Sequence, residues 1–336
     1  MYINDTFIFK NVTRIEKSLY RNQLNEVTVF DQLYDELSGH SAGYNLSKTL
    51  KAAIGEYNER WLLFNQYPKG MLFPAFSLTS NETIFVPQEN FLFTNFSYMD
   101  SLGEGSGISS KYALNSALLE FFERQSLLFH WIYQLKAKKI SEIEYQNLLP
   151  YEKLTNPKIK VYDISIFPNI FVIFIIGTFN KNQKVIGCAA DFNLENALSR
   201  AFKEVYEIFS GVNFSFKNVD EDRTLEKKVF GKLTPKELID AYSFLDQGID
   251  VPKPLNRFIR TKVSKKKLLQ IIEKFYQIKL FCIKVPNDIG NLKVIKIFSP
   301  KGVFKHMNVS IFTEEELNYF NKFMLEVKNT KEIPFP

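Results

Sequence analysis

The chain has 336 residues, enough for one large domain or two smaller ones, and a net charge of +6 from 43 Lys and Arg against 37 Asp and Glu. The charges are mixed along the chain without a basic stripe, which argues against a nucleic-acid binder and fits an anionic ligand such as a nucleotide. Two cysteines and three scattered histidines exclude a disulfide framework and make a zinc site unexpected, so a cytoplasmic location is the simpler expectation.

The predicted elements are helices and strands in blocks. In chain order, the pattern predicts a helix over 45–66, strand and loop over 83–97, a helix over 109–137, strands over 159–167, 170–179 and 183–191, helices over 194–210 and 264–277, strands over 279–285 and 291–298, and a helix over 313–328. The most apolar run, 170–176, is too short to cross a bilayer, and the N-terminus lacks the apolar core of a signal peptide. We therefore expect a cytoplasmic α+β protein without a membrane segment, formed by a single large domain over 1–336 with a proline-containing tail over 331–336.

The first two long helices carry the same charge pattern. GEYNER occupies 55–60 and LEFFER occupies 119–124, and each places two glutamates at i, i+3 and an arginine at i+4 on one helical face. The charged residues are Glu56, Glu59, Arg60, Glu120, Glu123 and Arg124. A single pattern of this kind usually marks a solvated face. Here both are surrounded by Leu, Ile, Phe, Trp and Ala, which is typical of buried helices, so we expect the charges to point into a shared interior cleft.

Four carboxylates in one cleft would repel each other unless a cation lies between them. Mg²⁺ prefers carboxylate oxygens and shares its coordination with phosphates, and arginines can contact phosphate. The SLGEGSG stretch at 101–107, with Gly103 and Gly107, adds backbone N–H groups that suit an anion; an ordinary flexible turn remains the alternative. Arg200 and Glu204 lie at i, i+4 on the helix over 194–210 and fit the same site; without the other two helices, a surface salt bridge would be the simpler interpretation.

Four segments together resemble the YcaO family of ATP-dependent enzymes, most closely the cyclodehydratase component of microcin-type thiazole/oxazole synthetases. They are SAGYNLSKTLKAAIGEYNER at 41–60, GISSKYALNSALLEFFERQSLLFHW at 107–131, NALSRAFKEVYE at 196–207 and the terminal IPFP at 333–336. The resemblance reaches from about residue 40 to the last residue and is weak between these segments. It implies a YcaO-like domain built around a nucleotide cleft, with ATP and Mg²⁺ as cofactors.

The resemblance also implies roles for individual residues. Mg²⁺ ions and the nucleotide phosphates would be held by Glu56, Glu59, Glu120 and Glu123, with further nucleotide contacts from Arg124, Arg200 and Glu204. The glycine-rich segment adds Gly103 and Gly107 as candidate nucleotide contacts through its backbone N–H groups. Arg124, Pro334, Phe335 and the carboxylate of Pro336 are candidate catalytic elements. The sequence departs from the family pattern at Ala52, where Ser is common, at Ile108, where Asn is common, and at Tyr112, where an acid is usual.

The implied reaction is ring closure on a peptide backbone, in which a Cys, Ser or Thr side chain attacks the preceding carbonyl carbon and ATP activates the amide oxygen. The implied partners are a precursor peptide, an E1-like leader-binding protein and a flavin-dependent dehydrogenase. Three alternatives stay open: a YcaO enzyme that makes a thioamide or an amidine, a scaffold that has lost catalysis, and a nucleic-acid binder based on the lysine-rich segment 260–279. The lysines at 265–267 are better explained as the solvated start of an amphipathic helix.

Overall fold

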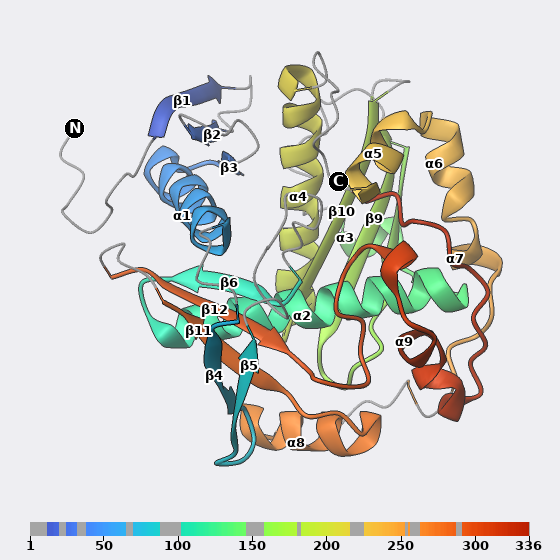
Figure 1. The fold of residues 1–336 in the computed structure, drawn as a ribbon. Helices are drawn as coiled ribbons and strands as arrows, with labels where there is room; N and C mark the ends of the chain where they lie inside the picture. The colour runs from blue at the N-terminus through green and yellow to red at the C-terminus, as the bar shows by residue number, and fades with distance from the viewer. Residues whose placement is uncertain are drawn as a thin grey trace.

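Helices and strands are both abundant, which confirms the predicted α+β class (Figure 1). The computed structural model describes residues 12–19, 25–31, 38–64, 70–87, 102–145, 158–179, 183–215, 225–252, 255, 263–286 and 291–335. No helix in these ranges is long and apolar enough to cross a membrane.

A five-stranded antiparallel sheet joins segments that are far apart in the sequence. Its order is β5-β4-β11-β12-β6, with bounds β5 Thr83–Pro87, β4 Leu72–Ser77, β11 Phe281–Val285, β12 Lys293–Phe298 and β6 Glu104–Gly107. Because side chains alternate along a strand, Val294 of β12 packs in a cluster with Leu62 of α1 (Leu46–Phe64), whereas Ile295 and Ile297 pack with α2 (Ser110–Tyr133). The two helices with the repeated charge pattern therefore cover opposite faces of one sheet.

Helix α2 is buried because a second sheet packs against it. This four-stranded antiparallel sheet has the order β10-β9-β8-β7, with bounds β10 Gln183–Asp191, β9 Phe171–Phe179, β8 Lys158–Asp163 and β7 Lys138–Lys139. Ile186 and Cys188 of β10 share the core of α2, whereas Val185 and Ala189 pack against α4 (Leu194–Ser215). The predicted pairing of strands 170–179 and 183–191 is confirmed.

The N-terminal sheet was not predicted from the sequence. It consists of β1 (Val12–Leu19), β2 (Asn25–Asp31) and β3 (Ser38–Gly43), in that order and antiparallel. Val27 and Val29 of β2 pack with Ala53 and Tyr57 of α1.

The remaining elements are α3 Glu142–Tyr145, α5 Leu225–Lys232, α6 Pro235–Ala241, α7 Phe244–Gln247, α8 Lys265–Tyr276, η4 Val309–Ile311, α9 Glu314–Asn318 and η5 Tyr319–Phe323.

Two local predictions were wrong. The expected helix over 313–328 is only the short α9 followed by the 3₁₀ turn η5, because Phe320 turns inward and its ring centroid lies 3.8 Å from that of Phe129, while Met324 adopts a φ of 60°. The glycine-rich segment before α2 is not a free loop, because its residues 104–107 form β6. In the prediction for 83–97, residues 83–87 are β5 and the others lie outside the described ranges.

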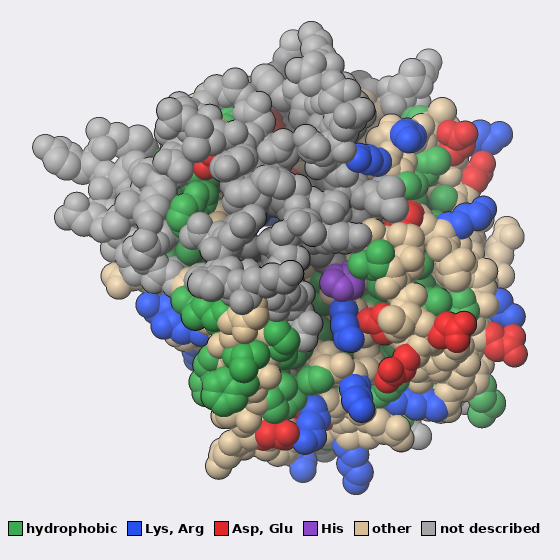
Figure 2. Space-filling view, viewed as in Figure 1, with side chains coloured by type: hydrophobic (Ala, Val, Ile, Leu, Met, Phe, Trp, Pro, Cys, Tyr) green, Lys and Arg blue, Asp and Glu red, His purple; other side chains and the backbone are tan. Residues whose placement is uncertain are grey.

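One face of the β4–β5 hairpin is apolar and uncovered in the described structure. The side chains of Leu72, Phe76 and Phe85 are 56%, 48% and 67% exposed, and Pro74 beside them is also exposed. Figure 2 shows an apolar patch at the lower left, where β4 and β5 lie in Figure 1. A contiguous apolar surface of this kind is typical of a contact with another macromolecule.

Candidate active site

Carboxylates from α1 and α2 come within electrostatic reach of each other at β6. The side chain of Ser106 on β6 hydrogen-bonds to Glu59 of α1. Burial is the main reason that the pKa of Glu59 rises from 4.5 to about 7; the negative charges of Glu56 and Glu120 contribute to this rise, while Ser106 and Arg60 oppose it. The structure therefore brings the two charged motifs together, as the sequence predicts.

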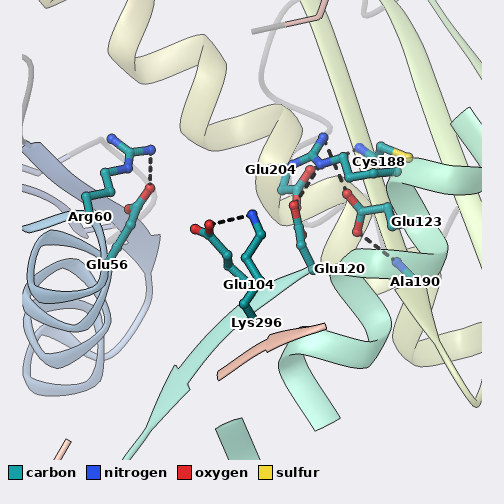
Figure 3. Close-up of polar contacts among 10 residues, drawn as sticks. Glu56, Arg60, Glu104, Glu120, Glu123, Cys188, Ala190, Glu204 and Lys296 are labelled. Carbon is teal, nitrogen blue, oxygen red and sulfur yellow. Dashed lines mark hydrogen bonds and ion pairs between the residues drawn. The ribbon is translucent and has the colours of Figure 1, made fainter. Parts of the chain in front are cut away.

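Arg124 lies among three carboxylates from two helices. Its Nε donates to Glu120 Oε1 at 2.7 Å, and its Nη1 lies 3.6 Å from Glu123 Oε1. Burial opposes the charge of Arg124, but Glu120, Glu123 and Glu204 outweigh burial and raise its pKa. Figure 3 shows Glu120, Glu123 and Glu204 gathered at the end of β10. Arg124 is thus the cation around which this part of the site is built.

Backbone groups of β10 hold two of these carboxylates. The amide of Ala190 donates to Glu123 Oε2 at 3.1 Å, and the amide of Cys188 donates to Glu204 Oε2 at 3.0 Å. Burial is the main reason that the pKa of Glu123 lies well above its usual range and that the pKa of Glu204 rises to about 7. The repulsion from Glu120 adds to both shifts, while Arg124 opposes them. The carboxylates are therefore fixed in orientation but short of positive charge.

Glu56 already uses both of its carboxylate oxygens. Arg60 Nη2 lies 2.6 Å from Glu56 Oε1, and the amide of His40 donates to Glu56 Oε2 at 2.6 Å. Arg60 also donates through Nη1 to the carbonyl of Ser38 at 2.7 Å. A metal role for Glu56 would thus require it to exchange one of these partners.

A buried ion pair on the sheet was missed by the sequence analysis. Lys296 Nζ of β12 donates to Glu104 Oε1 of β6 at 2.8 Å, and the two residues are direct partners in the register. Glu104 and Ser106 share a strand face, so this pair lies on the same side of the sheet as Glu59. In Figure 3 it is seen between the Glu56–Arg60 pair and Glu120. No local pattern could reveal the pair, because its partners are 192 residues apart in the sequence.

Arg200 and Glu204 do not pair with each other. Arg200 Nη1 donates to the carbonyl of Ala190 at 2.8 Å and lies 3.7 Å from Asp191 Oδ2, with 44% of its side chain exposed. Its positive charge still lowers the pKa of Glu123. Arg200 is therefore placed beside the carboxylates and open to a ligand, and its nucleotide contact stays a prediction.

The glycines of the 101–107 segment have a packing reason. Gly103 has a φ of 74°, and a Cβ there would lie 2.2 Å from the carbonyl oxygen of Ile297. A Cβ on Gly107 would lie 2.6 Å from the ring of Tyr112. Close approach of β6 to its neighbours accounts for both glycines without a ligand, so their predicted contact with the nucleotide stays untested.

The three departures from the family pattern lie at the surface. Ala52 is exposed on α1, and the side chains of Ile108 and Tyr112 are 58% and 64% exposed at the start of α2. None of them takes part in the contacts among the buried carboxylates described above. Tyr112 therefore leaves the arrangement of Glu120, Glu123 and Arg124 unchanged.

The C-terminal tail reaches the same site. The Phe335 ring lies 4.5 Å from the guanidinium carbon of Arg124, and the carbonyl of Pro334 accepts a hydrogen bond from the Tyr242 hydroxyl at 3.2 Å. Pro336 lies outside the described residues, and the catalytic roles of Pro334 and Pro336 stay predictions.

The site fits a magnesium-bound polyphosphate better than a bare metal ion. Among the described residues, no three His, Cys, Asp or Glu side chains are close enough to hold one ion by themselves. Two buried atoms in the same part of the chain have no hydrogen-bond partner, Glu123 Oε1 and Arg124 Nη1. They lie 3.6 Å apart as a loose ion pair, so a cation beside Glu123 Oε1 and an anion beside Arg124 Nη1 would complete the contacts of both. Mg²⁺ commonly binds through one or two carboxylates together with phosphates. The candidate ligands for magnesium ions are Glu59, Glu120 and Glu123, with no more than two of them on any one ion, and Arg124 is the candidate phosphate contact.

Replacement of Glu59 by Gln should stabilise the protein without metal or nucleotide, and more at pH 8 than at pH 5. Below pH 4.5 Glu59 is neutral in both the folded and the unfolded chain, whereas above about 7 the folded chain must keep it ionised at a cost. Wild-type stability therefore falls relative to the variant as the pH rises through this window, by about 1–3 kcal/mol. Urea unfolding at pH 5 and pH 8 measures the free energy of unfolding of the variant and of the wild type. If the two proteins differ by the same amount at both pH values, the pKa of Glu59 is not raised in the folded chain.

Comparisons with known proteins place the chain in a family. The family model described as YcaO cyclodehydratase, ATP- and Mg²⁺-binding, matches residues 18–300. The Escherichia coli microcin B17-processing protein McbD is 24% identical over 399 residues, with 95% of each chain covered. In the solved E. coli microcin synthetase McbBCD complex, one chain superposes with a TM-score of 0.72 at 20% identity, with 96% of each chain covered.

A YcaO structure from Methanopyrus kandleri bound with AMPPCP and Mg²⁺ superposes with a TM-score of 0.67 at 14% identity, covering 96% of this chain and 91% of the other. The predicted family and its cofactors, ATP and Mg²⁺, are thereby confirmed. The chain belongs to the YcaO family of ATP- and Mg²⁺-binding cyclodehydratases.

Proposed function

We propose that this protein is the azoline-forming, ATP-dependent cyclodehydratase of a complex that modifies a ribosomal precursor peptide. The observation that carries the proposal is the pair of buried atoms Glu123 Oε1 and Arg124 Nη1, which lie 3.6 Å apart within a cluster of carboxylates and have no hydrogen-bond partner among the described residues. An inactive scaffold would gain nothing from such a costly arrangement. The likeness to McbD, a microcin-processing protein, supports a peptide as the substrate.

ATP with Mg²⁺ would supply the phosphoryl group that turns the amide oxygen of the substrate into a leaving group. The chain's own residues would act by position and charge. Arg124 already orients Glu120, the amide of Ala190 orients Glu123, and Ser106 lies beside Glu59. These carboxylates would hold the magnesium ions together with the phosphates. Arg124 Nη1 would donate to a phosphate oxygen. Attack by a Cys, Ser or Thr side chain on the amide carbon, with loss of the side chain's proton and cleavage of the C–O bond to the phosphorylated oxygen, would release phosphate and give a thiazoline or an oxazoline.

We propose that the enzyme works in a heteromeric assembly with a precursor peptide, an E1-like leader-binding protein and a flavin-dependent dehydrogenase. Two findings support partners. Solved E. coli microcin synthetase complexes, one of them with pro-MccB17 bound, contain a chain of this fold. The uncovered apolar face of β4 and β5, with Leu72, Phe76 and Phe85, offers a surface for a protein partner.

Reconstitution tests the proposal. The protein is combined with ATP, Mg²⁺, the precursor peptide and the E1-like protein from neighbouring reading frames. Release of ADP and the mass of the peptide are then followed together. We expect the loss of one water for each ring and for each ATP consumed. A product that instead exchanges oxygen for sulfur would indicate a thioamide, and no peptide-dependent ATP turnover would favour a scaffold.

A further inference from the structure

The last described residues of the chain are anchored one after another. Trp131 Nε1 donates to the carbonyl of Lys331 at 2.7 Å, and the Tyr242 hydroxyl donates to the carbonyl of Pro334 at 3.2 Å. The side chain of Phe335 is only 5% exposed. Chain ends are usually loose unless something holds them, so this tail is built to deliver Phe335 to a fixed place.

That place is against the Arg124 guanidinium. The guanidinium carbon lies over the Phe335 ring, 4.5 Å from its centroid. This cation–π contact restricts the guanidinium without occupying an N–H donor in a conventional hydrogen bond. Nε is held at the edge by Glu120 at 2.7 Å, and Nη1 keeps no hydrogen-bond partner among the described residues. The Phe335 ring and the Glu120 carboxylate together restrict the Arg124 guanidinium and leave its Nη1 without a hydrogen bond in the described part of the chain.

We propose that Phe335 is a positioning residue that orients Arg124 and thereby couples docking of the C-terminal tail to nucleotide binding. The inference deepens the proposed function but requires only the nucleotide binding of the family. An arginine held in its binding orientation loses less freedom when a phosphate arrives, so the docked tail raises the affinity. By reciprocity, bound nucleotide stabilises the docked tail.

Four versions of the full-length chain test the coupling: wild type, Phe335→Leu, Arg124→Lys and the double variant. Leucine keeps an apolar side chain without a π face, and lysine keeps the charge without a planar group to stack on. Calorimetric titration with AMPPCP and Mg²⁺ gives the Kd of each. We expect Phe335→Leu to raise Kd about five- to tenfold in the wild-type background and less than about twofold in the Arg124→Lys background.

Phe335→Tyr keeps the aromatic face and should stay within about twofold of wild type. Thermal unfolding of every variant identifies any chain that fails to fold. An equal rise in Kd in both backgrounds would show that Phe335 acts by general packing and overturn the inference, as would an unchanged Kd in Phe335→Leu. If the titrations behave as expected but no peptide is dehydrated, the proposed reaction fails while the positioning role stands.

Discussion

Replacement of Glu120 by Gln is expected to lower precursor-dependent ATP turnover at least about a hundredfold while the chain stays folded. Glu120 is the carboxylate common to both parts of the site. Its charge raises the pKa of Glu59 on α1 and of Glu123 and Glu204 beside β10, and its Oε1 accepts from Arg124 Nε. Glutamine preserves the volume and one acceptor but cannot balance a divalent cation.

The matched control is Glu326→Gln, which removes a carboxylate that is 80% exposed and paired only with Lys328 among the contacts that the structure shows. ADP release with and without the precursor peptide is measured for both variants, and circular dichroism and thermal unfolding verify the fold. The control should keep wild-type turnover. A folded Glu120→Gln protein with unchanged turnover would remove the metal role assigned to this cluster.

Helix α2 shows how much of the site a sequence can predict. LEFFER places two glutamates and an arginine in a stretch that is apolar on nearly all sides, and such a helix must be buried. The charges then require a ligand or partners inside the protein. The structure confirms the burial, since α2 packs between two sheets and Glu123 is 1% exposed. Because one short segment shows both the burial and the charges, this part of the site could be predicted from the sequence.

Other parts of the site depend on contacts that no local pattern encodes. Strand β6 has four residues, two of them glycines, and its pairing partner β12 follows about 190 residues later. Its sequence therefore resembles a turn, and the ion pair of Glu104 and Lys296 stays hidden. Arg200 likewise follows tertiary structure, because the carbonyl of Ala190 is a closer partner than Glu204, one helical turn away. The register between β6 and β12 determines the ion pair, and a contact between β10 and α4 determines the partner of Arg200.

The N-terminal sheet and the end of the chain differ from expectation for a related reason. Gly39 of β3 packs so closely on α1 that a Cβ there would lie 1.9 Å from the carbonyl oxygen of Ala53. The close packing of Gly39 against α1, and not the strand propensity of its sequence, determines the position of β3. In the same way, the packing of Phe320 against Phe129 ends the helix that the pattern over 313–328 predicts. Tertiary packing overrides weak local propensity at both ends.

Replacing Arg124 by Lys or by Gln should separate the geometry of this residue from its charge. Lysine keeps the positive charge, but one ammonium cannot at once pair with Glu120, stack on Phe335 and present a further donor. We expect Arg124→Lys to lower the kcat/KM for the precursor peptide by about a hundredfold. In a plot of kcat/KM against pH, the acidic limb is the rise in activity as the carboxylates ionise. For Arg124→Lys this limb should lie where it does in the wild type, near the pKa of about 7 of Glu59 and Glu204.

Arg124→Gln should in addition move that limb to higher pH. Arg124 lowers the pKa of Glu123 and Glu204, so loss of its charge lets repulsion and burial raise both further. Carboxylates that bind Mg²⁺ must be ionised, so binding of AMPPCP with Mg²⁺ will require a higher pH than in the wild type. Titrations between pH 6 and pH 9 measure the shift. If the lysine and glutamine variants had the same limb, the positive charge of Arg124 would not control these carboxylates, and its role would be to contact the phosphate alone.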